Sequence, residues 1–179
     1  PPLAARANRA ANRAISTQFT NLEDAIWTDA GKDSKYSNKF FVRFLLSRGV
    51  RDPDGARYKP ENCFSGISDK FIELHNTNGR WNKSAISDAL KMMFDHATYM
   101  RIADTDWVAP LAAHNLDEEF YLRVLRDAKF EQWVPVYMAG AYRMNRNMGL
   151  PAVTSNITAV EYETEMKRLL MALTYVDVA

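Results

Sequence analysis

The stretch from Asn115 to Gly149 constrains the fold most, because it is the longest part of the chain with a coherent helical pattern. Asn115 is suited to accept hydrogen bonds from the first backbone amides of a helix, and Glu118 stands at the position that completes a capping box. Downstream, apolar side chains recur at spacings of three and four, which predicts one buried helical face. Its members are Leu116, Phe120, Tyr121, Val124, Leu125 and Ala128.

Pro135 lies inside this stretch and predicts a kink or a break near residues 132–134, since proline lacks a backbone N–H and its ring clashes with the preceding turn. We expect a second helix from about Val134 to Asn147, with Gly149 as its C-terminal cap. The stretch therefore divides into a buried first helix and a second helix whose end carries exposed polar side chains.

The same spacings predict shorter helices in the rest of the chain. They cover residues 3–19, 21–27, 38–48 and 68–75, a segment that begins at Ser84, and a last helix capped by Thr158. The expected buried rows are Phe40, Phe41, Phe44 and Leu45; Ile86, Leu90, Met93, Ala97 and Met100; and Tyr162, Met166, Leu169 and Leu173. Gly49 is expected to end the helix over 38–48, and residues 52–55, Asp-Pro-Asp-Gly, are expected to form a turn.

These patterns favour a mainly α fold with little or no sheet, because no period-two alternation extends beyond four residues. A chain of 179 residues with 47% apolar side chains is large enough to bury one proper core. We therefore expect a compact single-domain bundle of about six to eight helices. The expected divisions are a basic helical arm over 1–20, the core domain over 21–175 and a tail over 176–179.

Cys63 is the single cysteine, which excludes an intramolecular disulfide and a cysteine-rich metal site. A reducing compartment is therefore expected, either the cytoplasm or a virion assembled there. No segment has the length and apolar character of a membrane span, so no membrane partner is expected. The start at Pro1, with neither an initiator Met nor an apolar leader, is interpreted as trimmed, processed or incomplete.

Sequence motifs for catalysis are missing from the chain. His75, His96 and His114 lie far apart and form no metal-binding pair at helical spacing. The Asp104-Thr105-Asp106 triplet resembles the start of a calcium loop, but the glycine and the distant glutamate in register are missing. We therefore expect no catalytic residues, no metal site and no cofactor.

The net charge of +1 conceals an uneven distribution. Residues 1–60 carry eleven basic and six acidic side chains, whereas residues 61–179 carry twelve basic and sixteen acidic ones. A protein that neutralises phosphates needs several Lys or Arg on one surface, with aromatic side chains within reach of the bases. The basic third, in which Tyr36 and Tyr58 are interleaved, therefore favours nucleic-acid binding over a merely solvated face.

The candidate phosphate-binding residues form three groups: an arm, a basic stretch and the end of the second helix in the 115–149 region. They are Arg6, Arg9 and Arg13; Lys39, Arg43, Arg48, Arg51, Arg57 and Lys59; and Arg143 and Arg146. The last two also have a purely structural explanation, because cations near a helix C-terminus interact favourably with the helix dipole.

Three hypotheses for function follow. The first is a structural assembly protein, a helical coat- or nucleocapsid-like subunit of a virus, which self-associates into an oligomer or polymer and binds single-stranded RNA through phosphate contacts. The division into a positive and a negative part suits head-to-tail contacts between copies. The second is a helical protein-interaction or regulatory domain that binds no nucleic acid. The third is an enzyme whose acidic site is assembled from distant segments that no linear motif reveals.

Overall fold

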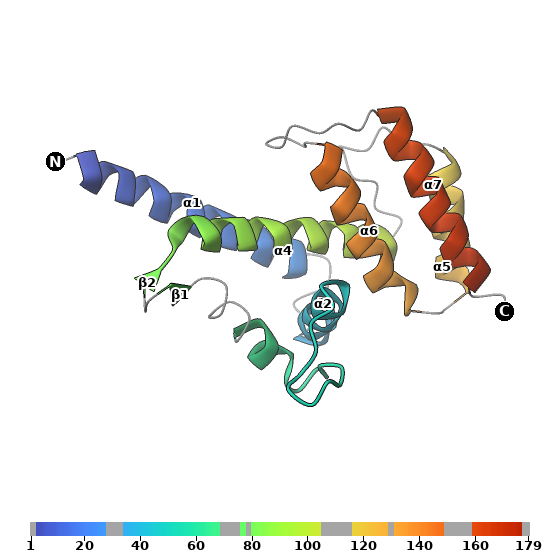
Figure 1. Cartoon of the computed structure of the whole chain (residues 1–179), viewed down its shortest axis with the longest axis horizontal. Helices are drawn as coiled ribbons and strands as arrows, with labels where there is room; N and C mark the ends of the chain where they lie inside the picture. Colours follow the sequence, from blue (N-terminus) through green and yellow to red (C-terminus); the bar gives the residue numbers. More distant parts are fainter. Residues whose placement is uncertain are drawn as a thin grey trace. The chain divides into compact units, whose positions relative to one another are not determined.

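The computed structural model describes residues 3–27, 34–68, 76–77, 80–104, 116–128, 131–148 and 159–176. These ranges are mainly helical (Figure 1). The helices are α1 (Leu3–Trp27), α2 (Ser34–Ser47), α4 (Lys83–Asp104), α5 (Leu116–Asp127), α6 (Trp133–Met148) and α7 (Ala159–Val176). A further helical segment covers 63–68. Two strands of two residues each, β1 (Asn76–Thr77) and β2 (Arg80–Trp81), pair antiparallel. The predicted mainly α fold with little sheet is confirmed.

The chain divides into two compact units, unit 1 over residues 1–97 and unit 2 over residues 98–179, with the boundary inside α4. The expected division into arm, core and tail stays a prediction. Among the described helices, none combines the length and the hydropathy needed to cross a bilayer.

In unit 1, α1 and α4 lie side by side (Figure 1). Lys83 Nζ donates to Asn8 Oδ1 at 2.5 Å and to Asn12 Oδ1 at 2.8 Å, and Ser87 Oγ donates to Gln18 Oε1 at 2.8 Å. A later residue of α4, Ser87, thus contacts a later residue of α1, Gln18, than Lys83 does. We conclude that α1 and α4 run parallel to each other.

α1 differs from the expectation of two helices over 3–19 and 21–27, because it continues without a break to Trp27. Asn21 was expected to cap a new helix. Leu22 and Ile26 are instead buried at 4% and 3% exposure, in phase with the half-buried Ile15. Burial of this row stabilises a continuous helix more than a new cap would, so the arm and the following segment are one element.

α2 carries the aromatic part of the core in unit 1. Phe40, Phe44 and Leu45 are buried as predicted, whereas Phe41 is half-buried. The helix ends before Gly49, which has a φ of +67°, and the amide of Val50 donates to Leu45 O at 2.9 Å. Such a left-handed residue after the last turn is a common helix ending, and it confirms the predicted stop.

α4 begins one residue earlier than expected and is capped by a different residue. Asn82 Oδ1 accepts from the amides of Ser84 and Ala85 at 3.1 and 3.3 Å, so Asn82 is the N-cap and Ser84 is not. The predicted stripe is otherwise observed. Leu90, Met93, Ala97 and Met100 are buried, and Ile86, which was also predicted to be buried, is half-buried.

In unit 2, α5 and α6 each pack against α7. α5 ends at Asp127 and α6 begins at Trp133, so the predicted break occurs, although α5 ends earlier than expected. Pro135 lies in the first turn of α6, where its missing N–H has no helical partner to lose, and it is buried there without ending the helix. Tyr137, Met138 and Ala141 are fully buried in the core of this unit.

The predicted buried face of α5 is observed only in part, since Leu125 is buried and Tyr121 half-buried as part of that row. Phe120 and Val124 are 62% and 41% exposed and Ala128 is also exposed, whereas Leu122 and Leu125 are buried at 4% and 1%. Both sets have helical spacing, and the contact with α7 decides between them. On α7, Leu170 is the fully buried residue, and Leu169 and Leu173 of the predicted row are half-buried. The expected caps Asn115, Gly149 and Thr158, and the helix over 68–75 beyond its first residue, lie outside the described residues.

A small cluster fixes the chain that follows α2. Leu45, Tyr58 and Cys63 are buried together, and Val50 and Ile67 pack against them. Gly66 lies so close to the Tyr58 ring that an added Cβ would come within 2.7 Å of it. The absence of a side chain at residue 66 therefore allows the Tyr58 ring to close the cluster.

This contact predicts the effect of Gly66→Ala. Alanine would gain helix propensity, but the buried Tyr58 ring cannot move away freely, so overpacking should dominate and lower the free energy of unfolding by about 1–2 kcal/mol. Gly140→Ala is the matched control, since its nearest neighbour is a terminal methyl of Leu169 that can rotate away. Urea unfolding followed by circular dichroism measures both variants, and equal midpoints for the two would contradict the expectation.

Candidate nucleic-acid interface

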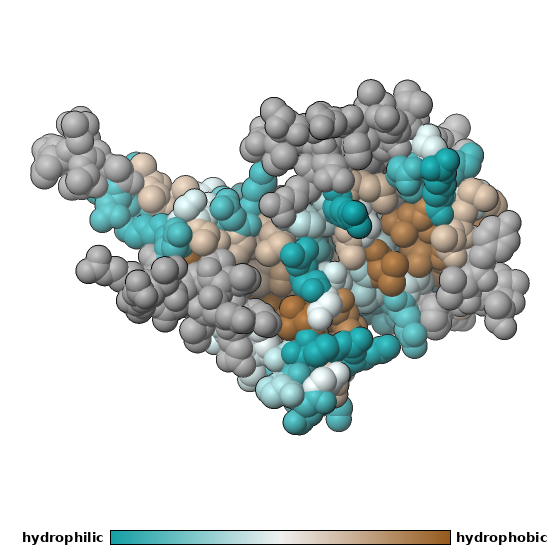
Figure 2. Space-filling view, viewed as in Figure 1, coloured by the Kyte–Doolittle hydropathy of each residue, from teal (hydrophilic) through white to brown (hydrophobic). Residues whose placement is uncertain are grey.

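The exposed cations among the predicted residues fall into two groups in unit 1. Arg9 and Arg13 are exposed on α1, one helical turn apart and therefore on one face. The second group lies on the connection over 48–62, whose surface is hydrophilic in Figure 2. It consists of Arg48, Arg51, Arg57 and Lys59, all exposed.

The connection over 48–62 is held by its own hydrogen bonds. Asp52 Oδ1 accepts from the Ala56 amide at 2.6 Å, and Asn62 Oδ1 accepts from the Lys59 amide at 2.7 Å. Gly55, with a φ of +78°, donates to Asp52 O at 2.9 Å and closes the predicted turn over 52–55. With Tyr58 buried beneath, the connection presents its cations from a fixed backbone.

Two residues of the basic stretch are placed differently from the expectation. Arg43 is buried at 5% exposure, between Phe40 and Phe44 in sequence, and Lys39 is half-buried. A guanidinium at this depth is not at the surface where a phosphate of a bound strand would lie. Arg43 is therefore corrected from a surface contact to a core residue of α2.

The remaining predicted cations are Arg6, Arg143 and Arg146. Arg6 lies on α1, near the start of the helix, while Arg143 is exposed on α6 and Arg146 lies near the C-terminal end of α6. Arg143 and Arg146 belong to unit 2 and the others to unit 1. The α1 pair and the 48–62 group thus belong to the same unit, and the α6 pair belongs to the other.

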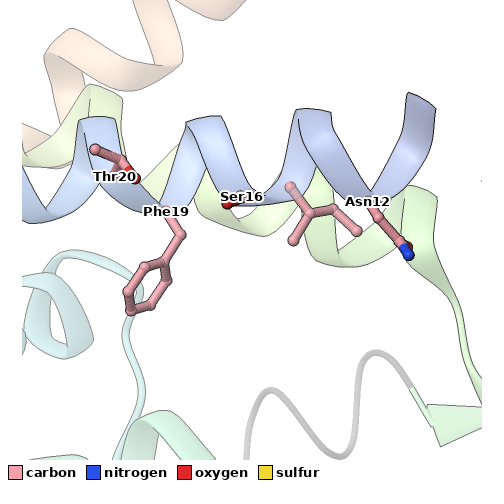
Figure 3. A pocket seen from close by; sticks show the side chains of 5 residues that line it. Asn12, Ser16, Phe19 and Thr20 are labelled. Carbon is pink, nitrogen blue, oxygen red and sulfur yellow. The ribbon is translucent and has the colours of Figure 1, made fainter. Parts of the chain in front are cut away.

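A groove runs along α1 (Figure 3). It has a volume of about 400 Å³ and is lined by Asn12, Ile15, Ser16, Phe19 and Thr20. Figure 3 shows the Phe19 ring and the Asn12 side chain projecting from α1 into this space. Phe19 is 57% exposed, although its spacing from Ile15 and Leu22 would place it in the buried row. Spacing alone would bury Phe19, so its exposure could not be predicted from the sequence.

Lys83 is a further cation that the sequence analysis missed. Its Nζ binds Asn12, a lining residue of the groove, and Asn8 one turn earlier. Lys83 is half-buried and held in place by two amide oxygens, so its charge adds to that of Arg9 and Arg13 at the same end of the groove. No sequence signal indicated it, because the contact joins residues more than seventy positions apart.

Two titratable groups of α4, Asp95 and His96, have pKa values that burial has shifted. His96 is fully buried, and its pKa is lowered to about 4, mainly by burial. The hydrogen bond to Met92 O opposes this shift, and the charge of Arg48 adds to it. Nδ1 must donate in that 2.8 Å bond because the carbonyl can only accept. A neutral imidazole without access to solvent cannot act on a substrate, so His96 is a core residue.

Burial also shifts the pKa values of Asp95 and Cys63. Burial raises the pKa of the half-buried Asp95 to about 6, partly opposed by Lys91 one turn earlier. Burial also raises the pKa of the Cys63 thiol, which donates to Pro60 O at 3.4 Å. The thiol is therefore protonated and packed in the Tyr58 cluster, where it is unreactive.

Within the described part of the chain, no three side chains of His, Cys, Asp or Glu are grouped closely enough to hold a metal ion. The Asp104 to Asp106 triplet extends beyond the described residues. Comparisons with protein-family models, with curated proteins and with solved structures found no match to this chain.

The opposite shifts of Asp95 and His96 predict a pH dependence of stability. Below pH 6.5 the unfolded state protonates His96 while the folded state does so only near pH 4, so acidification over this range destabilises the fold. The folded state keeps the Asp95 proton up to about pH 6 whereas the unfolded state releases it near pH 3.8, so acidification stabilises the fold over nearly the same range. The two contributions oppose each other in the wild type.

Asp95→Asn removes the contribution of residue 95 to the pH dependence of stability and leaves that of His96. Between pH 7 and pH 4 this variant should lose about 3 kcal/mol from His96 with no compensation at residue 95. Urea unfolding of the wild type, the variant and the exposed-site control Asp88→Asn at both pH values measures the difference. The assignment is wrong if Asp95→Asn shows the same pH dependence as the wild type.

Proposed function

We propose that this chain is a structural assembly subunit, similar in role to a viral coat or nucleocapsid protein, that self-associates and binds single-stranded RNA through phosphate contacts. The observation that carries the proposal is the set of exposed cations held on two ordered elements of unit 1. They are Arg9 and Arg13 on α1, with Arg48, Arg51, Arg57 and Lys59 on the 48–62 connection.

Phosphate binding depends on how many cations reach the backbone of a bound strand, because each neutralised phosphate releases condensed counterions. The side chains on the 48–62 connection extend from a backbone that hydrogen bonds and the buried Tyr58 fix. A fixed backbone lowers the entropy lost on binding. This geometry supports a contact surface that follows the sugar-phosphate backbone without reading base sequence.

Self-association is supported by the exposed row on α5, formed by Phe120, Val124 and Ala128. We propose that it binds the same row of a second copy. In an antiparallel pair centred on Val124, the large Phe120 of one copy faces the small Ala128 of the other, and this arrangement is self-complementary. Arg123 and Asp127 are both exposed beside the row and would lie at the edge of this interface.

Purification of the full chain followed by two measurements tests the proposal. The ratio of absorbance at 260 to 280 nm reports co-purified nucleic acid, and negative-stain microscopy reports assembly. We expect a raised ratio and oligomeric particles. A monomer free of nucleic acid in both measurements, which also fails to bind added single-stranded RNA, contradicts the proposal.

The cations on the 48–62 connection give a quantitative prediction. The triple variant Arg48→Ala/Arg51→Ala/Arg57→Ala should weaken RNA binding and reduce the slope of log K against log salt concentration by about 2, since each phosphate contact to a single strand contributes roughly 0.7. Fluorescence anisotropy with a labelled oligouridine measures it. The control is Lys167→Ala/Arg168→Ala, on the exposed surface of α7, which should keep the wild-type slope. If the slope of the triple variant is also unchanged, the 48–62 connection is not part of the RNA interface.

The α5 row gives a prediction for assembly. Phe120→Ser/Val124→Ser should lower the assembly mass measured by light scattering, because burial of a Phe or Val side chain at the interface contributes about 1.5–3 kcal/mol. Both residues are exposed, so the fold should be retained. Val136→Ser is the matched control, since Val136 is 49% exposed on α6 and outside the row. If the double variant assembles like the control, the α5 surface is not the interface.

A further inference from the structure

The groove on α1 brings three chemical features close together. Asn12, Ser16 and Phe19 line it at steps of four and three, and Arg9 and Arg13 each lie one turn before a lining residue, Asn12 and Ser16. Cations occupy one end, an amide and a hydroxyl lie in the middle, and an aromatic ring lies toward the other end. A ligand seated along this groove would meet charge first and then the ring.

Phe19 is an unusual residue to leave in solvent at this position. The same helix buries Leu22 and Ile26, yet the Phe19 ring is 57% exposed and projects into the groove (Figure 3). Full burial of such a ring would stabilise a protein by roughly 1.5–3 kcal/mol. Because Phe19 stays largely exposed, the fold gains little of this stabilisation. The exposed ring is therefore available as a flat apolar surface for a planar group.

We propose that this groove is a binding site for an unpaired nucleobase, with Phe19 as the stacking platform and the adjacent phosphate held by Arg9 and Arg13. The inference rests on the proposed function and deepens it, because it assigns a base-contacting site to a protein otherwise proposed to contact only phosphates. A volume of about 400 Å³ lies within the range of small-ligand pockets and accommodates one base with its sugar.

The charges along α1 set the direction of the bound strand. Arg9, Arg13 and the Lys83 ammonium beside Asn12 attract phosphates at the N-terminal end of the groove. Glu23 is exposed one turn beyond Phe19 and repels them at the other end. Arg13 and Phe19 are six residues apart, roughly 9 Å along the helix axis. The strand thus enters with its backbone at the arginines and places one base on the ring.

The hydroxyls of Ser16 and Thr20 line the groove beside the ring. Each can donate one hydrogen bond and accept others, so they suit the sugar or the base edge of any nucleotide. A stacked base in a duplex presents no free face to an aromatic side chain, whereas an unpaired base does. The site therefore selects single strands over duplexes and tolerates different bases.

Oligonucleotide binding to the full chain, followed by fluorescence anisotropy, tests the stacking directly. The probes are a labelled oligouridine, the corresponding deoxythymidine oligomer, a duplex of equal length and an abasic oligomer that keeps the phosphates. Phe19→Ala should weaken binding to oligouridine by between about fivefold and a hundredfold, since one base stacked on an aromatic ring contributes about 1–3 kcal/mol. The salt slope should not change, because the ring touches no phosphate.

The abasic oligomer and Phe19→Ala together form a thermodynamic cycle that isolates the contact between the ring and the base. The wild type should lose affinity when the bases are removed, and Phe19→Ala should lose much less, because the ring and the base are two sides of one contact. Phe19→Tyr keeps a stacking ring and should bind like the wild type. Val136→Ala, which removes exposed apolar surface from α6 and lies outside both proposed surfaces, is the matched control.

The outcomes separate the inference from the function on which it rests. If the wild type binds the abasic oligomer as tightly as oligouridine, or if Phe19→Ala and Val136→Ala bind alike, phosphate binding stands and the stacking site is overturned. If the wild type binds none of the probes, the proposed function itself fails. Comparison of oligouridine with the deoxythymidine oligomer shows whether the 2′-hydroxyl contributes.

Discussion

Burial of the apolar row of α4 is the constraint on which the rest of unit 1 depends. Leu90, Met93 and Ala97 are removed from water, and this requires that other helices supply matching apolar faces. α2 supplies Phe44, whose ring meets the His96 ring of α4 in a T-shaped arrangement at a centroid distance of 5.1 Å. α1 in turn packs against α2 and buries Leu22 and Ile26. Once these faces are committed to the core, the opposite face of α1 is left in solvent.

The side chains proposed to bind RNA are those that this packing leaves exposed to solvent. Arg9, Arg13 and the Phe19 ring are exposed on α1, and the connection after α2 carries its own cations above the buried Tyr58. A surface for a flexible polyanion needs such fixed positive charge more than it needs a deep cavity. In unit 2 the exposed row of α5 has a different character, apolar with charges at its edge, and this suits contact with a second copy.

The helices and most of their buried rows could be predicted from spacing alone, because the period of an α-helix fixes which residues share a face. What spacing does not decide is which of two competing faces meets a partner. α5 has two apolar sets, and the partner helix α7 selects Leu122 and Leu125 over Phe120 and Val124. Arg43 was misplaced because an arginine is exposed by default, although its spacing of three from Phe40 puts it on the buried side of α2. Lys83 could not have been selected at all, since its partners Asn8 and Asn12 are brought near it only by the fold.

The most direct measurement of the central claim is ultraviolet crosslinking of single-stranded RNA to the full chain, with mass spectrometry of the modified peptides. The account predicts adducts on peptides that contain residues 9–20 of α1 and residues 48–62 of the connection. Adducts confined to residues 98–179, or a complete absence of adducts under conditions where a known single-strand-binding protein gives them, would contradict it.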